Sequence, residues 1–130
     1  MKMILLIIII TFGLHSISSA QKHTEKEIKE LLCHKWKVAS FQPLGGEIKK
    51  ASGYSVFMTF GSDGSLLKVD PKDTISGKWS YDHKVKLIYL KEKNRTLEHK
   101  IITISADELI IDAKLDGKDG YMTLKRVGED

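Results

Sequence analysis

The sequence predicts an all-β protein, an eight-stranded antiparallel up-and-down barrel with a short N-terminal helix. Three observations lead to this prediction. Apolar and polar side chains alternate with a period of two from Trp36 to Arg126, and turn residues recur at intervals of about 8–13 residues. Most connections are too short for crossover helices, which excludes a parallel sheet. An antiparallel series of this length tends to close into a barrel, because closure removes exposed sheet edges.

Residues 1–20 are predicted to be a cleaved signal peptide, and residues 21–130 a single barrel domain. Lys2 supplies a positive charge, and the apolar run Ile4–Leu14 is too short to span a bilayer core of about 30 Å. Small residues end this segment, so cleavage is expected after Ala20. We therefore expect a periplasmic or secreted protein with no stable membrane anchor after cleavage, an uncleaved anchor being the alternative.

The composition narrows the classes of function. The chain carries a formal net charge of +4, and its lysines are spread along the sequence rather than clustered. Nucleic-acid binding is not expected, because it needs a concentrated basic face with aromatic residues between the charges. Cys33, the single cysteine, excludes an internal disulfide. It is expected to pack as a small buried hydrophobe, the alternative being a reactive thiol. The protein is expected to be a monomer.

A helix is predicted over Thr24–Lys35. Thr24 suits the N-cap, and Glu27, three residues later, completes a capping box. Ile28, Leu31 and Leu32 follow helical spacing and are expected to dock against the barrel.

The period then changes from helical spacing to two. In the fourth predicted strand, for example, Ile75, Gly77, Trp79 and Tyr81 share one face. The Asp-Gly pair within 61–65 suits a hairpin turn, whereas 47–53 and 114–120 are predicted loops. The eight strands are expected at 36–41, 54–60, 66–69, 75–81, 85–91, 96–104, 109–112 and 121–127.

A series of short motifs resembles the bacterial exported lipocalin-like domain proteins. The motifs are, in order, Leu-Leu-x-x-x-Trp-Lys-Val-x-Ser-Phe, Met-Thr-Phe-x-x-Asp-Gly, Gly-x-Trp-x-Tyr, Asp-Glu-Leu-Ile-Ile and Met-Thr-Leu-Lys-Arg-Val. They cover residues 31–127. The resemblance implies a lipocalin-like (calycin-type) up-and-down β-barrel, often with an apolar cavity, and no enzymatic activity.

The resemblance also implies a contact that closes the barrel. In lipocalins the tryptophan of the first strand packs against a basic side chain of the last strand. Trp36 matches the tryptophan, and Arg126 matches the basic residue better than Lys125 does. A guanidinium over an indole contributes about 0.5–2 kcal/mol. His34 departs from the family pattern, because the motif has glycine at this position.

The residues that could line the barrel interior are mostly aromatic or apolar. The alternative is that they fill the interior completely, since a barrel of eight strands is just wide enough for either arrangement. His99 is included because it shares a predicted face with Leu97 and Ile101. The predicted ligand-binding residues are Tyr54, Val56, Met58, Trp79, Tyr81, Leu87, Tyr89 and His99.

No pattern in the sequence indicates catalysis, a metal or a cofactor. The histidines lack the spacing of zinc motifs, and nothing places a serine on a nucleophile elbow. The sequence therefore predicts a non-enzymatic exported protein that binds a small hydrophobic ligand, either apolar or amphipathic, in its barrel. The alternative is a packed barrel that acts through its loops, 43–53 or 114–120, as an envelope protein–protein interaction module or inhibitor.

Overall fold

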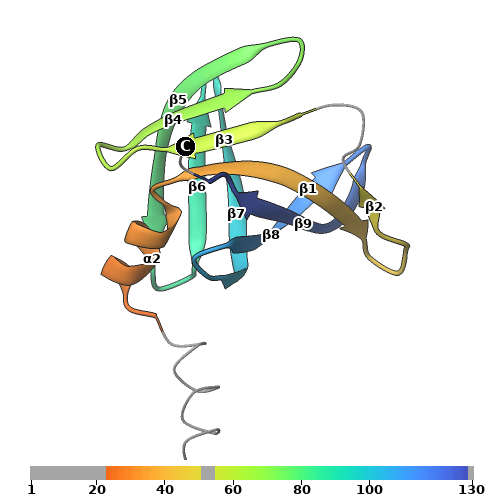
Figure 1. Cartoon of the computed structure of the whole chain (residues 1–130), viewed down its shortest axis with the longest axis horizontal. Helices are drawn as coiled ribbons and strands as arrows, with labels where there is room; N and C mark the ends of the chain where they lie inside the picture. Colours follow the sequence, from red (N-terminus) through yellow and green to blue (C-terminus); the bar gives the residue numbers. More distant parts are fainter. Residues whose placement is uncertain (1–22, 51–54, 129–130) are drawn as a thin grey trace, which may run out of the picture.

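The computed structural model describes residues 23–50 and 55–128, which form one short helix followed by an antiparallel β-barrel (Figure 1). The predicted signal peptide lies outside the described residues. The elements are α2 (Glu25–Leu32), β1 (Lys35–Pro43), β2 (Lys49–Lys50), β3 (Phe57–Phe60), β4 (Ser65–Val69), β5 (Thr74–Asp82), β6 (Leu87–Glu92), β7 (Arg95–Ile104), β8 (Glu108–Leu115) and β9 (Lys118–Arg126).

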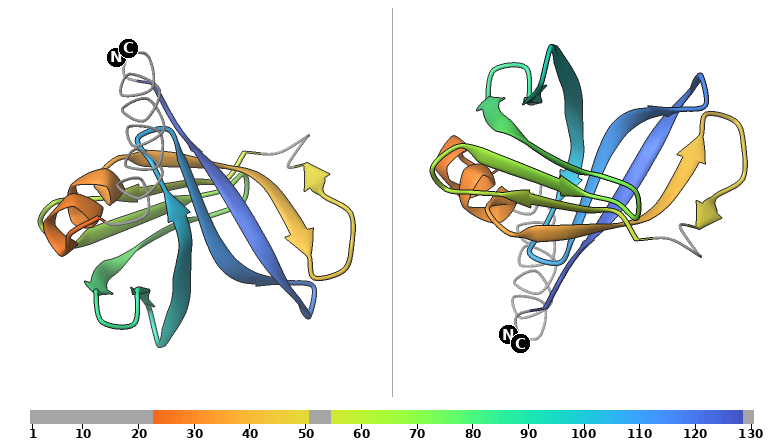
Figure 2. Two further views of the ribbon diagram at one scale, coloured as in Figure 1. Left: turned by 90° about the horizontal axis from the view of Figure 1, so that it is seen from below. Right: turned by 90° about the horizontal axis from the view of Figure 1, so that it is seen from above.

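Eight strands, β1 and β3 to β9, close the barrel. Each pairs antiparallel with its neighbour in sequence, and β9 returns to pair with β1 along the whole length of that strand. Figure 2 shows β1 and β9 side by side. The prediction of an eight-stranded antiparallel up-and-down barrel with a short N-terminal helix is confirmed.

The second strand of the barrel is interrupted. β2 and β3 both pair with the edge of β1 that faces away from β9. Between the two pairings, β1 advances from Lys37 to Ser40, whereas the opposite chain advances from Lys50 to Phe57. A continuous β-ladder cannot form here, because β1 advances by three residues where the opposite chain advances by seven. The predicted strand at 54–60 is therefore shortened to β3, and β2 lies in the predicted loop.

Helix α2 begins with the predicted capping box. Thr24 Oγ1 accepts a hydrogen bond from the Glu27 backbone N–H (3.1 Å), and Glu27 Oε1 accepts one from the Thr24 N–H (2.9 Å). These hydrogen bonds to Thr24 lower the pKa of Glu27. The helix ends at Leu32, three residues earlier than predicted, with Ile28 and Leu32 buried against the barrel.

Trp36 ties the helix to the first strand. Its side chain is completely buried, and its indole N–H donates to the backbone carbonyl of Leu32 (3.0 Å). The same carbonyl also accepts the backbone N–H of His34 (2.7 Å). His34, which stands where the family pattern has glycine, is therefore held in the turn between α2 and β1. In the register of β1 and β9, Arg126 lies directly opposite Trp36. This register is the one that the predicted Trp36–Arg126 contact requires, since paired residues project from the same face.

The core fills the end of the barrel that the helix covers. Strand termini that meet at this end supply most of it, including Phe60, Leu66, Ile104 and Leu109. The other buried members are Ile28, Leu32, Trp36, Val38, Met58, Tyr81, Ile88, Leu90, Ile101, Ile111 and Leu124. The helix end is therefore closed by packing, and any open volume must lie toward the other end.

A β-bulge in β1 changes which side chains face inward. The register with β9 shifts by one residue between Val38 and Ser40. Trp36 and Val38 are buried as predicted, but beyond the bulge Phe41 and Pro43 are buried in place of Ser40. The extra residue in one strand explains the change of face, because side chains alternate along a strand.

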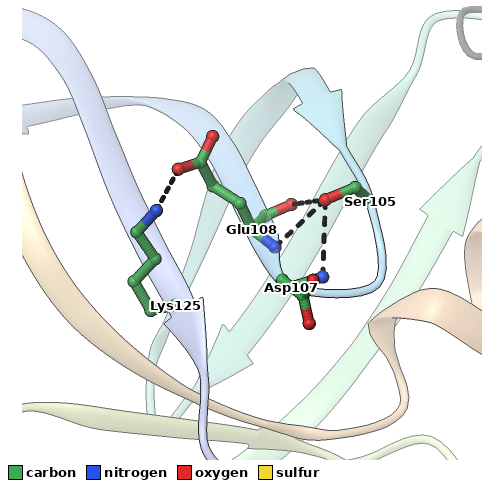
Figure 3. A network of polar contacts seen from close by, with 4 residues as sticks. All are labelled: Ser105, Asp107, Glu108 and Lys125. Atoms are coloured by element: carbon green, nitrogen blue, oxygen red, sulfur yellow. Dashed lines mark hydrogen bonds and ion pairs between the residues drawn. The ribbon is translucent and has the colours of Figure 1, made fainter.

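The turn between β7 and β8 supports the same end of the barrel from outside (Figure 3). Ser105 Oγ accepts hydrogen bonds from the backbone N–H groups of Asp107 and Glu108, and the Glu108 carboxylate pairs with Lys125 of β9. The Asp107 carbonyl accepts the backbone N–H of Arg126 (3.0 Å). The turn is thereby fastened to the strand that closes the barrel.

The predicted loop at 114–120 is wrong in extent. Strands β8 and β9 continue to Leu115 and Lys118, and only Asp116 and Gly117 form the turn. Both have positive φ angles (52° and 77°), as a two-residue type I′ hairpin requires. The charged composition of this segment suits exposed strand ends as well as it suits a loop.

We predict that Trp36→Ala lowers the free energy of unfolding by about 3–5 kcal/mol, because the substitution leaves a cavity at the covered end of the barrel. Trp36→Phe should destabilise the protein less, because phenylalanine retains much of the ring volume. The remaining loss would come mainly from the missing hydrogen bond to Leu32. Urea denaturation measures both effects. The exposed aromatic Tyr121 is a control, and Tyr121→Ala should change stability by less than about 1 kcal/mol. An equally small loss for Trp36→Ala would contradict the closure argument.

Candidate functional site

A pocket of about 700 Å³ opens at the end of the barrel opposite helix α2. Its walls include inner-face side chains of most of the barrel strands, which are Val38, Met58, Lys68, Leu97, His99, Ile111 and Met122, together with Val56 just before β3. Val38, Met58 and Ile111 belong to the buried core, so they form the floor, while Val56, Leu97 and Met122 are partly buried. The interior is therefore hollow at one end and packed at the other.

One charged cluster projects from the inner face at this end. The Glu92 side chain is only 2% exposed, and its two carboxylate oxygens contact different cations. Oε2 lies 2.6 Å from Lys68 Nζ, and Oε1 lies 3.2 Å from an Arg95 guanidinium nitrogen. Lys68 and Arg95 line the pocket, with side chains 22% and 64% exposed. Glu92 thus holds two cations at the pocket wall.

Local structure explains why a carboxylate lies in the interior at this point. Glu92 is the last residue of β6, on the same face as the buried Ile88 and Leu90. Its partner in β5 is Gly77, which in turn lies opposite Leu66. A Cβ atom at Gly77 would lie 2.2 Å from the Lys91 carbonyl oxygen. Only glycine fits where β5 and β6 approach so closely, and its missing side chain leaves room across the inner face beside Glu92.

The ion pairs keep Glu92 ionised. Burial on its own raises the pKa of this carboxyl, but the hydrogen bonds and charges of Lys68 and Arg95 outweigh burial and lower the pKa from its usual value. A buried carboxylate with two cations is therefore a fixed feature of the pocket near neutral pH.

His99 is a further polar side chain on the inner wall. Its Nδ1 lies 2.8 Å from the backbone carbonyl oxygen of Asp112, and the Asp112 carboxylate is farther away, at 3.9 Å. A carbonyl oxygen only accepts, so Nδ1 carries the proton and donates. In the neutral ring, Nε2 is then an acceptor. His99 can therefore offer a polar contact in addition to those of Lys68 and Arg95.

Three of the predicted ligand-binding residues meet in this pocket: Val56, Met58 and His99. Tyr54 lies outside the described residues. Alternation predicts the three pocket residues correctly, because the fully buried residues of β3 occupy every second position, as do the buried or half-buried residues within 97–101 of β7.

Leu87 and Tyr89 were assigned to the wrong face. Ile88 and Leu90 are the buried apolar residues of β6, and they lie opposite Tyr81 and Trp79 in the register with β5. Leu87 and Tyr89 alternate with them and project outward. The segment from Leu87 to Leu90 is apolar at four consecutive positions, so its composition does not indicate which face is buried.

Trp79 and Tyr81 have the predicted inward orientation but lie at the helix end, away from the pocket. The Trp79 indole N–H donates to the Gly61 carbonyl (2.8 Å), and its ring meets Phe60 edge to face at a centroid distance of 5.5 Å. The Tyr81 hydroxyl lies 3.0 Å from His83 Nδ1. Burial, helped by nearby Glu25 and Asp82, raises the pKa of Tyr81. These contacts hold both rings in the wall and give them a structural role.

Trp79 and Tyr81 also border a second hollow, a groove of about 920 Å³ between α2 and β5. Although larger, it is a weaker candidate, because it is an open surface feature whose helix side is lined by Glu25, Lys26, Lys29 and Glu30. Solvated charges of this kind give little binding energy to an apolar molecule. Cys33 also lines this groove and is half-buried; burial, with Asp63 and Glu30, raises the pKa of its thiol.

Sequence reasoning missed the cluster of Lys68, Glu92 and Arg95. The predicted strands at 85–91 and 96–104 leave Glu92 to Arg95 between them as a turn, but the turn is only Lys93 and Asn94. A signal did exist. Ile88, Leu90 and Glu92 continue one alternation, so a carboxylate falls on the face that carries the apolar residues. To use this signal, one must know which face of β6 is buried, and the sequence does not indicate that face.

The described parts of the chain show neither a metal centre nor a membrane-spanning helix. No group of three or more His, Cys, Asp or Glu side chains is placed to hold a metal ion. None of the described helical structure has the length and apolar character needed to cross a membrane.

Solved structures with the same architecture come from two Bacteroides species. A lipocalin-like protein from Bacteroides uniformis matches with a TM-score of 0.57 and 18% identity, over 75% of this chain and 99% of that one. A DUF4847 family protein from Bacteroides vulgatus matches with a TM-score of 0.54 and 16% identity, over 79% and 99%. The fold is that of a lipocalin-like β-barrel. No protein-family model and no curated protein matches the sequence.

We predict that Glu92→Gln lowers the free energy of unfolding by about 1.5–3 kcal/mol at neutral pH, because it weakens charged hydrogen bonds to two cations that remain partly exposed to solvent. The pKa of Glu92 is lowered in the folded state, so its contribution is fully present above the unfolded-state pKa. The contribution is lost as the pH falls through the folded-state pKa. Wild type and variant should therefore converge in acid.

Chemical denaturation across the range from neutral to acid pH measures this convergence. Glu98→Gln is the matched control, since Glu98 is an exposed carboxylate on the adjacent strand β7. A constant difference between wild type and Glu92→Gln at every pH would show that the ionised carboxylate is not the source of the stability.

Proposed function

We propose that this protein is a non-enzymatic, exported binding protein that holds a small amphipathic molecule in the open end of its barrel. The volume of the pocket carries the proposal. About 700 Å³ falls within the range of about 300–1,000 Å³ that is usual for small-molecule sites. A binding role also agrees with the lipocalin-like barrel fold.

The lining of the pocket favours an amphipathic molecule. Leu97, Met122 and Val56 offer partly exposed apolar surface, and methionine adapts to ligands of different shape. Among the inner-face side chains that line the pocket, three are polar: Lys68, Arg95 and His99. The other polar lining residues come from outward-facing positions of β7, β8 and β9, and they are Glu98, Asp112, Lys114, Asp119 and Tyr121. Mostly apolar walls with a few placed polar groups are typical of ligand sites.

The absence of catalysis is part of the proposal. The described residues that line the pocket include no serine, threonine or cysteine to act as a nucleophile. The pocket histidine contacts a backbone carbonyl, whereas a nucleophile–histidine pair would require it to contact the attacking group. The alternative of a packed barrel acting through its loops has less support, because segment 114–120 is mostly strand.

We expect the apolar probe N-phenyl-1-naphthylamine to fluoresce on binding, and Leu97→Trp to abolish this signal by filling the pocket. Leu67→Trp is the matched control, because Leu67 is an exposed residue on β4. Equal probe binding by both variants would place the probe elsewhere. Native mass spectrometry of the protein purified from its own host should then reveal a co-purified small molecule.

Export is tested by the mass of the mature chain. When the full chain is produced in a bacterium with a signal peptidase, the secreted or periplasmic product should begin at Gln21. Ala20→Arg should block processing, because a small residue is required directly before the cleaved bond. An unprocessed wild-type chain found in the cytoplasm would contradict the proposal.

A further inference from the structure

We propose that the cluster of Lys68, Glu92 and Arg95 makes the barrel selective for amphiphiles with a single negative charge. The apolar tail would occupy the pocket, and the anionic headgroup would bind at Lys68 and Arg95. This inference rests on the proposed function, since it names the chemical class of the ligand for the same pocket.

The geometry of the cluster presents its positive groups to the pocket and keeps its negative group behind them. Lys68 and Arg95 line the pocket, whereas Glu92 is buried and contacts each cation with a different oxygen. The Lys68 ammonium has three N–H donors and Arg95 has five, and each uses one in the contact with Glu92. Donors therefore remain for a headgroup that reaches the pocket wall.

The charges of the cluster do not cancel. One carboxylate and two cations leave a single positive charge in a partly buried position, where electrostatic interactions are stronger than in water. A monoanionic headgroup would neutralise this charge and form charge-assisted hydrogen bonds. A neutral headgroup would form weaker bonds, and an ammonium would be repelled.

Apolar surface adjoins the cluster directly. Lys68 lies opposite Met58 in the register of β3 and β4, and Arg95 lies two residues before Leu97 on the same face of β7. A molecule with its headgroup at the cluster would therefore place its chain against Met58 and Leu97. The positive wall and the apolar wall are close enough for one short amphiphile to contact both.

Three acidic residues also line the pocket, and two of them have partners of their own. Asp112 Oδ1 accepts the backbone N–H of Lys100 (2.6 Å), and Asp119 lies 3.8 Å from Lys114. Glu98, Asp112 and Asp119 are exposed or about half exposed, so solvent and salt screen them. Lys68, at 22% exposure, is screened less.

The test compares three molecules with the same twelve-carbon chain and different headgroups: dodecanoate, dodecanol and dodecylammonium. Each displaces N-phenyl-1-naphthylamine from the full mature protein near neutral pH. Dodecanoate should bind about tenfold or more tightly than dodecanol, which is the increment expected of hydrogen bonds to charged groups. Dodecylammonium should bind most weakly.

Arg95→Gln is the first variant, because it leaves Lys68 and Glu92 as a balanced pair and alters an exposed side chain that should not affect folding. It should weaken the binding of dodecanoate far more than that of dodecanol, so that most of the preference for dodecanoate is lost. Lys72→Gln is the control, since it removes the same charge from an exposed turn at the same end of the barrel. A triple variant, Lys68→Met, Glu92→Met and Arg95→Met, replaces the whole cluster by apolar side chains, which proteins often tolerate.

The outcomes separate the two proposals. Equal binding of dodecanoate and dodecanol by the wild type would overturn the selectivity and leave the binding function intact. A preference for dodecanoate that survives in the folded triple variant would show that another part of the barrel recognises the charge, which also overturns the inference. Failure of all three molecules and of the probe to bind the folded wild type would overturn the proposed function itself.

Discussion

The structure depends above all on the pairing of β1 with β9, which converts an open sheet of sequential hairpins into a closed barrel. Trp36 begins this pairing, opposite Arg126, and its indole hydrogen bond to Leu32 fixes the covering helix at the same end. The turn at Ser105–Glu108 is fastened to β9 close by. Three connections of different kinds therefore meet at one end, and this end contains the core.

The opposite end lacks such a concentration of contacts, and this asymmetry creates the pocket. The bulge in β1 and the break between β2 and β3 both lie on the strands that form this half. Here the interior carries a buried carboxylate with two cations rather than further apolar side chains. Packing stability and a candidate binding surface thus occupy separate halves of one small barrel.

The fold could be predicted from the sequence because its signals are local: the capping box at Thr24, the Asp63-Gly64 turn and the alternation along β5. The site was predicted only in part. Met58 and His99 lie on strands whose burial alternates clearly, whereas Leu87–Leu90 is apolar on both faces. Lys68 and Glu92 are 24 residues apart in the sequence. They meet only because β5 pairs with β4 on one side and with β6 on the other.

Covering one end of the barrel with a helix also has a kinetic consequence. A molecule that occupies the pocket would enter and leave at the open end, past the hairpins of β6–β7 and β8–β9 and the loop after β1. Rates of entry and release would then be set by these connections, whereas resistance to unfolding is set by the core around Trp36. Sequence changes at the mouth could therefore alter residence time while the rest of the barrel keeps its stability.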